Sequence, residues 1–305
     1  MDAGNTAIID KIMSLKKAKN ALFLVHNYQL GEVQDIADFA GDSLELSRKA
    51  ATSDADVIVF CGVHFMAETA AILNPERTVL LPDLHSGCPM ADMINADQLR
   101  ELKKKHPKAK VVCYVNSTAE VKAESDICCT SANAVKIVET LKDAEEIIFV
   151  PDQYLGSYAA EQTGKEMILW PGYCPTHARI LPSDIQKRKA ENPNAVVIVH
   201  PECKVETRAL ADARLSTGQM AQFAQETDKK EIIVGTEIGL LHRLRKENPD
   251  KTFISATEQA ICPRMKLITL ETVLWSLENM ENRITIPEEI SIKAKNAVDR
   301  MLEVH

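Results

Sequence analysis

The sequence predicts an α/β fold made of three repeated αβα units, whose parallel sheets are arranged around a pseudo-threefold axis with the active site at their central junction. The first observation is a Cys-Pro pair that occurs three times at nearly equal spacing, at Cys88, Cys174 and Cys262. The second is a set of polar residues that keeps one register in all three segments. The third is the alternation of continuous apolar runs with helical segments, which is typical of parallel sheets covered on both faces. Together they define a unit of about 87 residues that is present three times.

The shared register is read from the residue that ends the first apolar run of each unit. This residue is His26, Tyr114 or His200. Polar or ionisable side chains recur two, twelve and seventeen residues further on, namely Tyr28, Asn116 and Glu202; Asp38, Asp126 and Asp212; and Ser43, Ser131 and Thr217. Three cysteines alone could be evenly spaced by chance, so it is the agreement of the flanking residues that establishes the repeat.

Composition favours a protein that acts on small metabolites. The chain has 305 residues, 45% of them hydrophobic, and a net charge of −8. It has no block rich in Lys or Arg, so nucleic acid is not an expected partner. Residues 1–20 have the pattern of an amphipathic helix rather than a signal peptide, and no apolar run reaches the roughly 20 residues that span a bilayer. We therefore expect a cytoplasmic protein without a membrane segment, whose eight cysteines are buried apolar residues or metal ligands rather than disulfides.

The first unit, residues 21–106, is expected to have the order βαβαβαβ. The segment ALFLV at 21–25 is entirely apolar, which predicts a buried first strand, and DVIVF at 56–60 is the clearest strand of the unit. The remaining elements are expected to be helices over 33–39, 44–51 and 65–73, a short strand through Ala40 and Gly41, and a strand over 78–81 that leads into the loop of Cys88.

The second unit, residues 107–192, and the third, residues 193–282, repeat this order. Their strands are expected at KVVCYV, DICCT, EIIFV and MILW, and at AVVIV, ARLS, EIIV and TFIS. Short polar segments at 106–110 and 190–195 are predicted to be linkers. One helix over 1–20 precedes the units, and a closing helix over 283–305 follows them.

This layout places the recurring polar residues and the three cysteines just after strands. Open α/β sheets bind ligands at the carboxyl ends of their strands. Three units that face inward would therefore bring these side chains to one central cavity.

The three cysteines in register favour an iron–sulfur cluster over zinc. Structural zinc usually takes four clustered ligands at short spacings, whereas three thiolates on a [4Fe-4S] cluster leave one iron open as a Lewis acid. The other cysteines are Cys61, Cys113, Cys128 and Cys129, which lie in or beside apolar strands and are expected to fill the core, and Cys203, which stays undecided. No CxxC spacing is present, which argues against thioredoxin-like redox chemistry.

The polar residues divide into two chemical groups. Ser43, Ser131 and Thr217 lie where a strand turns into a helix, a position that suits either a plain N-cap or a bound anion. The candidate proton-transfer groups are His, Tyr and Glu side chains at strand ends, for which a satisfied core histidine is the alternative. These are His26, Tyr28, Tyr114, His200 and Glu202. His177 and Glu68 are weaker candidates, expected to contact active-site residues rather than the substrate.

At these residues the chain resembles the quinolinate synthase family. The matching segments are HNYQ, GDSLELS, GVHFMAETA, YVNSTAE, TSANA, HPEC and STGQM, in this order over nearly the whole chain. The resemblance implies three similar αβα domains around a [4Fe-4S] cluster, with Cys88, Cys174 and Cys262 as its ligands. It also implies condensation of iminoaspartate with dihydroxyacetone phosphate to quinolinate, phosphate and two waters, without net redox change. The enzyme that supplies iminoaspartate is then a candidate partner.

By the same resemblance, nine residues match active-site positions. Glu202, His200, Tyr28, His26 and Tyr114 are the catalytic candidates, and His26, Ser43, Tyr114, Asn116, Ser131, His200, Glu202 and Thr217 are the candidates for binding substrate. The chain departs from some members of the family at Met265, where those members have a further cysteine. No regulatory disulfide is therefore expected beside Cys262.

Two other functions use the same features. A different hydro-lyase with an open-iron cluster would need the same thiolates and anion sites, and its product would distinguish it. A non-catalytic iron–sulfur sensor or electron-transfer protein would favour a fourth protein ligand, and would not need His, Tyr and Glu side chains directed at the cluster.

Overall fold

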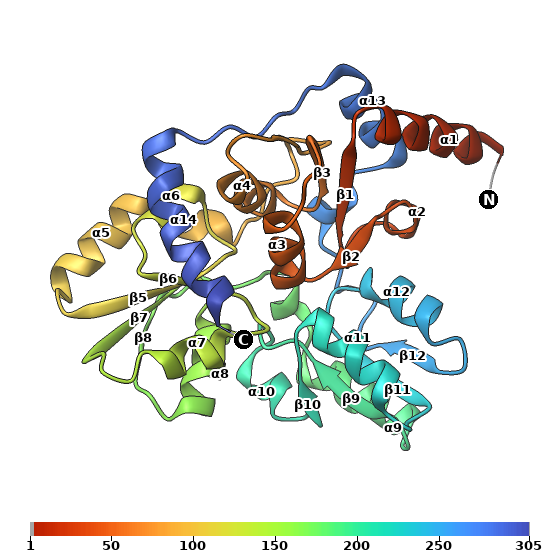
Figure 1. Cartoon of the computed structure of the whole chain (residues 1–305). Coiled ribbons are helices and arrows are strands. Elements are labelled where there is room, and N and C mark those ends of the chain that lie inside the picture. Colours follow the sequence, from red (N-terminus) through yellow and green to blue (C-terminus); the bar gives the residue numbers. More distant parts are fainter. Residues whose placement is uncertain (1–2, 305) are drawn as a thin grey trace.

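The computed structural model describes residues 3–304 and consists of three four-stranded parallel sheets flanked by helices (Figure 1). The sheets have the orders β2-β1-β3-β4, β6-β5-β7-β8 and β10-β9-β11-β12, so the same strand order is repeated three times. The strands are β1 (Ala21–His26), β2 (Phe39–Gly41), β3 (Val57–Cys61), β4 (Thr78–Leu80), β5 (Ala109–Tyr114), β6 (Ile127–Cys129), β7 (Glu146–Val150), β8 (Ile168–Leu169), β9 (Val196–Val199), β10 (Ala213–Arg214), β11 (Glu231–Gly235) and β12 (Thr252–Ser255). The predicted α/β fold with three repeated parallel units is confirmed, and the predicted domain boundaries stay a prediction.

The helices cover both faces of the sheets. They are α1 (Ala3–Ala18), α2 (Gly31–Asp35), α3 (Ser43–Ala51), α4 (His64–Leu73), α5 (Ala96–Lys105), α6 (Ala119–Ala123), α7 (Ala134–Thr140), α8 (Gln153–Thr163), α9 (Pro182–Glu191), α10 (Val205–Arg208), α11 (Thr217–Glu226), α12 (Leu240–Glu247), α13 (Leu270–Asn279) and α14 (Glu288–Glu303). Three short 3₁₀ helices, η1 (Ala91–Met93), η2 (His177–Arg179) and η3 (Pro263–Lys266), each follow one of the cysteines of the Cys-Pro pairs. Among residues 3–304, no helix is both long enough and apolar enough to cross a membrane.

The apolar strands form the core because each sheet is covered on both faces. All five residues of β3 are buried, as are the last four of β1, β5 and β7. Burial of such side chains is the main favourable term in folding, at roughly 25 cal/mol per Å² of apolar surface. A continuous apolar strand is therefore the sequence signature of this kind of sheet.

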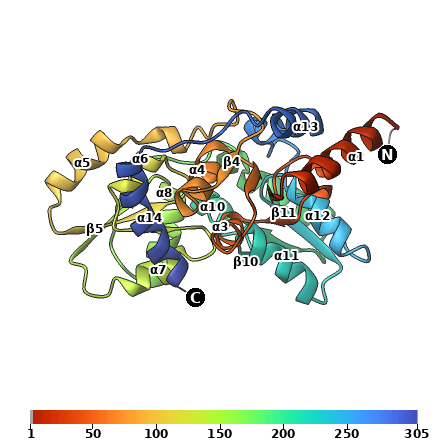
Figure 2. The same ribbon diagram turned by 45° about the horizontal axis from the view of Figure 1, so that its top comes forward.

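The two terminal helices pack on different units. Helix α1 packs against α13 and β1, whereas α14 crosses to the second unit and packs against α6 and β6 and also contacts α4 (Figures 1 and 2). The segment between α13 and α14 thus connects the third unit back to the second. Helix α14, which follows the third unit in the chain, thus contacts elements of both the second and the first unit.

Two boundary predictions were wrong. The helix expected over 33–39 is α2, which ends at Asp35, because Phe39 belongs to β2 and pairs with Leu24 of β1. The predicted linkers overlap regular structure: β5 already begins at Ala109, and α9 continues to Glu191. Both predicted linkers include residues at the exposed end of a strand or helix, and the polar character of these residues resembles that of a loop.

The aspartates that recur twelve residues into each unit stabilise the backbone. The carboxylate of Asp38 accepts a hydrogen bond from the backbone N–H of Phe23, that of Asp126 from Val111, and that of Asp212 from Val197, each at 2.8 Å. Each bond links the residue just before the second strand of a unit to the first strand. The polar position at offset twelve is therefore structural, and its aspartates do not line the cavity.

We expect Asp126→Ala to lower the free energy of unfolding by about 1 kcal/mol, because the Val111 N–H loses its charged acceptor. Urea denaturation measures this change. Iron content and turnover are expected to match wild type. Loss of either in a folded Asp126→Ala protein would contradict the structural role.

Candidate active site

A single cavity lies where the carboxyl ends of the three sheets meet. All twelve residues predicted for the site line it, namely His26, Tyr28, Ser43, Cys88, Tyr114, Asn116, Ser131, Cys174, His200, Glu202, Thr217 and Cys262. They come from all three units, and the same cavity has apolar walls that include Phe65, Met66 and Met90. This is the place where parallel sheets present loops to a ligand. The structure thus brings the predicted residues together, while their individual roles stay predictions.

Histidines of the first and third units adopt the same local arrangement. Nδ1 of His26 accepts a hydrogen bond from the backbone N–H of Tyr28 at 3.1 Å, and Nδ1 of His200 accepts one from Glu202 at 3.3 Å. Each ring therefore carries its proton on Nε2. Burial lowers the pKa of both histidines to about 3, so both are neutral imidazoles. His200 uses its Nε2–H toward the Ser131 hydroxyl, 3.2 Å away.

A chain of hydrogen bonds connects Tyr28 to Glu202 through two further residues. Nδ1 of His177 lies 2.6 Å from Oε2 of Glu202, so Nδ1 carries the proton and Nε2 accepts. The Thr236 hydroxyl donates to that Nε2 at 2.9 Å, and Thr236 Oγ1 in turn accepts from the Tyr28 hydroxyl at 2.5 Å. The Tyr28 oxygen also lies 3.3 Å from Nε2. This chain can move protons between a phenol and a carboxylate without a large movement of any side chain.

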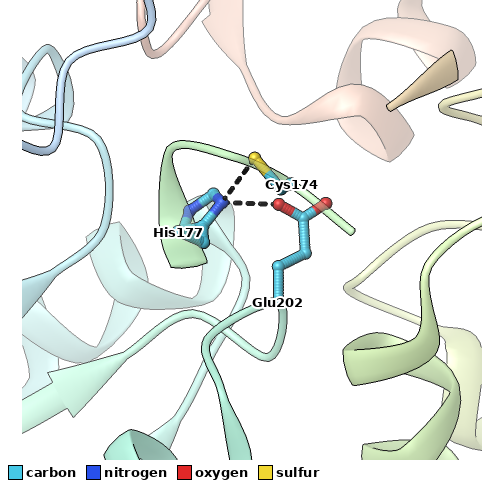
Figure 3. A group of neighbouring side chains, drawn as sticks. All are labelled: Cys174, His177 and Glu202. Carbon is cyan, nitrogen blue, oxygen red and sulfur yellow. Dashed lines mark hydrogen bonds and ion pairs between the residues drawn. The ribbon is translucent and has the colours of Figure 1, made fainter. Parts of the chain in front are cut away.

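His177 also contacts the thiol of the central cysteine. Figure 3 shows one nitrogen of its ring facing both Cys174 and Glu202, and this Nδ1 lies 3.2 Å from the Cys174 sulfur. Ligand atoms of these three residues lie within 4.8 Å of one another, a grouping that could also hold a single metal ion. Such an ion would have to replace the short bond between His177 and Glu202. The contact at 2.6 Å is that of a Glu202 carboxylate held by the His177 imidazole, beside the Cys174 sulfur.

Charges in the cavity are set by burial and by Glu202. Burial alone would raise the pKa of Glu202, but the charge and hydrogen bond of His177, with smaller contributions from His200 and the Tyr114 hydroxyl, lower it below the usual range. Burial, followed by the charge of Glu202, raises the pKa of Tyr28 and Tyr114 well above that of a free tyrosine. Glu202 is therefore an ionised carboxylate, beside the protonated phenols of Tyr28 and Tyr114 and the neutral imidazoles of His26 and His200.

Two buried acceptors in the cavity have no hydrogen-bond partner within the part of the chain that the structure describes. They are Oδ1 of Asn116 and Oε1 of Glu202. An unsatisfied buried acceptor costs about 1–3 kcal/mol, and native proteins rarely keep one without reason. Both residues line the cavity, where a bound polar ligand could donate to these oxygens.

Ser43 and Thr217 are the first residues of α3 and α11 rather than their caps. The N-cap residues are Asp42 and Ser216, whose side chains bind the free N–H groups of the first turn. Ser43 and Thr217 themselves line the cavity. The plain-cap alternative for these two residues is excluded by the positions of Asp42 and Ser216.

The three Cys-Pro cysteines suit a cluster, and the other five do not. Cys88, Cys174 and Cys262 are half-buried, free and on loops after the fourth strand of each unit, and all three line the cavity. The remaining cysteines are fully buried, and Cys203, the undecided one, packs in the core of the third unit with its thiol toward the Gly235 carbonyl oxygen. Three soft thiolates in one cavity fit the donor set of a cluster with an open iron.

Sequence reasoning missed Thr236 and underweighted His177. Thr236 directly follows β11, and a search of the residue after every strand, rather than after the first strand of each unit, would have found it. Glu68, the other weak candidate, does not line the cavity; its carboxylate accepts from the Ala119 backbone N–H at 3.1 Å and so joins α4 to α6.

Comparison with known proteins agrees with the resemblance seen in the motifs. The family model described as quinolinate synthetase A protein matches residues 10–303. A quinolinate synthase of Dehalococcoides mccartyi is 65% identical over 297 residues, which is 97% of this chain and 98% of the relative. Quinolinate synthase 1 of Methanosarcina acetivorans is 54% identical over 297 residues and covers 97% of each chain. The chain therefore belongs to the quinolinate synthase family.

Proposed function

We propose that the chain is a quinolinate synthase that condenses iminoaspartate with dihydroxyacetone phosphate to quinolinate, phosphate and two waters. The atoms of the two substrates, hydrogen and oxygen included, add up to those of quinolinate, phosphate and two waters, so the reaction balances without an electron acceptor. The observation that carries the proposal is the convergence of side chains from three units on one cavity that contains three half-buried thiols. The enzyme that supplies the unstable imine is a natural partner.

We infer that Cys88, Cys174 and Cys262 hold a [4Fe-4S] cluster. Three thiolate ligands leave one iron without a protein ligand, and the cluster then supplies a Lewis acid for a hydroxyl or carboxylate of the substrate. A cytoplasmic setting, which keeps thiols reduced, suits this ligand set.

The dicarboxylate part of the substrate is assigned to neutral donors of the second unit. Tyr114 is protonated because burial and Glu202 raise its pKa, and it can donate to a carboxylate. Asn116 offers an amide whose Oδ1 is still unsatisfied, and the Ser131 hydroxyl is held by His200. Neutral donors bind a carboxylate without adding to the positive charge of the site.

The phosphate of dihydroxyacetone phosphate is assigned to Ser43 and Thr217. Both begin helices of at least nine residues, α3 and α11, and the positive end of a helix dipole favours an anion. Their hydroxyls come from the first and third units, so the phosphate would lie between these units.

Proton transfer is assigned to Glu202 and the residues bonded to it. Glu202 is the ionised base, and a proton taken up there can be exchanged with His177 at 2.6 Å and, through Thr236, with Tyr28. His26 and His200 present Nε2–H groups as donors. General acid–base catalysis of this kind is typically worth about 10²–10⁴ in rate.

We expect the chain, purified without air, to form quinolinate from dihydroxyacetone phosphate and iminoaspartate generated from oxaloacetate and ammonia. The measurement is quinolinate by chromatography, together with iron and sulfide counts. Protein treated with a chelator is the control and should be inactive. Cluster-replete protein that makes no quinolinate would reject the function in favour of another hydro-lyase or a sensor.

A further inference from the structure

One carboxylate joins the first turns of two helices from different units. Asp42 precedes α3 in the first unit and is only 6% exposed. Its Oδ1 accepts from the backbone N–H groups of Leu44 and Glu45, both at 3.0 Å. Its Oδ2 points the other way, to the start of α11 in the third unit, where it accepts from the Ser216 hydroxyl at 2.9 Å and from the Gly218 N–H at 3.3 Å.

The close approach of the two helices depends on a glycine. A Cβ at Gly218 would lie 2.8 Å from Oδ2 of Asp42 and 2.9 Å from Oε2 of Glu45, closer than such atoms can come. Glu45 is held in place because its Oε2 accepts from the Asp42 backbone N–H at 2.8 Å. The start of α11 is therefore shaped to receive the carboxylates of the first unit.

Thr217 lies between the two residues that Asp42 binds, and a second link from the first unit fixes its hydroxyl. Nδ2 of Asn27 donates to Thr217 Oγ1 at 2.9 Å, and Asn27 is oriented by Arg243, which donates to its Oδ1 at 3.1 Å. Because Oγ1 already accepts this bond, the Thr217 hydroxyl proton is available for a ligand. Ser43, next to Asp42 in the chain, lines the same cavity.

We propose that Asp42 is a positioning residue that sets the distance between the hydroxyls of Ser43 and Thr217, and thereby the affinity of the enzyme for the phosphate of the triose phosphate. The inference rests on the proposed function, in which these two hydroxyls bind that phosphate. One carboxylate controls both because Ser43 adjoins it in sequence and Thr217 is held between its two partners.

The test is Asp42→Asn, which keeps the size of the side chain. Asparagine retains an oxygen for Leu44 and Glu45, but turns an amide toward the Gly218 N–H, where two donors repel each other. We expect KM for dihydroxyacetone phosphate to rise about tenfold, the loss of roughly one charge-assisted hydrogen bond. KM for iminoaspartate, kcat and iron content should change less than twofold, since uniform binding of one substrate is affected. The inhibition constant for inorganic phosphate should rise by the same factor.

Two more variants separate positioning from general destabilisation. Gly218→Ala should give the same selective rise in KM, because its Cβ displaces the carboxylates, and it serves if Asp42→Asn does not fold. Asn95→Ala removes a comparable N-cap from α5, away from the cavity, and should lower the melting temperature without changing either KM.

A double-mutant cycle tests the route through Thr217. In a Thr217→Val background, Asp42→Asn should raise KM for the triose phosphate by clearly less than tenfold, because one of the two hydroxyls that it positions is gone. Full additivity, an equal rise in both KM values, or an unchanged KM in folded Asp42→Asn would each overturn the proposal. If wild type makes no quinolinate, the proposed function fails, and equal binding of inorganic phosphate to wild type and Asp42→Asn would then overturn the positioning role separately.

Discussion

Replacing Glu202 by glutamine is expected to reduce quinolinate formation by about 10²–10⁴-fold while the iron–sulfur cluster stays bound. Glutamine has nearly the same size, but it cannot take up a proton, and it cannot provide the charge that Nδ1 of His177 contacts at 2.6 Å. The relay from Tyr28 through Thr236 then ends at a group that accepts no proton. Single-turnover formation of quinolinate, with iron and sulfide counts on the same samples, measures both expectations.

The matched control for this variant is Glu68→Gln. Glu68 is also a buried glutamate, but its carboxylate binds the Ala119 backbone N–H and does not line the cavity. Glu68→Gln therefore makes the same substitution at a residue that has no contact with the proposed proton relay, and turnover should stay close to wild type. Full activity of Glu202→Gln would reject Glu202 as the base, and loss of iron in that variant would make it a ligand instead.

Replacing Cys174 by serine is expected to abolish the cluster, with iron, sulfide and visible absorbance falling to background and no quinolinate formed. Iron–sulfur clusters are held by cysteine thiolates, and a serine hydroxyl is a far poorer ligand for iron, so only two thiolates would remain in this variant. Cys88→Ser and Cys262→Ser should behave alike, because all three sulfurs line the same cavity.

The control is Cys203→Ser, which makes the same substitution at a cysteine that lies in the core of the third unit and does not line the cavity. Its thiol is fully buried and faces the Gly235 carbonyl oxygen, so serine should cost some stability and leave the cluster intact. If Cys174→Ser retained full iron and sulfide while Cys203→Ser lost them, the assignment of ligands would be wrong.

The sequence by itself determined the repeated architecture and the membership of the site. A strand that is buried on both faces must be apolar along its whole length, so the strands at 56–60 and 146–150 were recognisable without any tertiary information. Polar residues that interrupt such a pattern at the same offset in three units must each be satisfied or functional. This reasoning selected His26, Tyr114 and His200, and all three line the cavity.

The repeat of polar residues did not show which of the recurring positions belong to the site and which stabilise the fold. Position twelve was polar in every unit, like the others, but its aspartates bind backbone N–H groups within their own sheets. A residue that binds a backbone N–H group and a residue that lines the cavity are both polar and both lie beside an apolar strand, so the sequence pattern is the same for the two roles. Only the direction of the side chain distinguishes them.

Only the tertiary structure decided which side chains of different units form hydrogen bonds with each other. Thr236 connects Tyr28, 208 residues away, to His177, and Asp42 binds Ser216 across 174 residues. Nothing near these residues in the sequence records such contacts, because threonine and aspartate at the end of a strand or the start of a helix also fit local roles. The composition of each unit is set by local burial and periodicity. The hydrogen-bond chain from Tyr28 to Glu202 and the spacing of Ser43 and Thr217 are set by how the three units pack against one another.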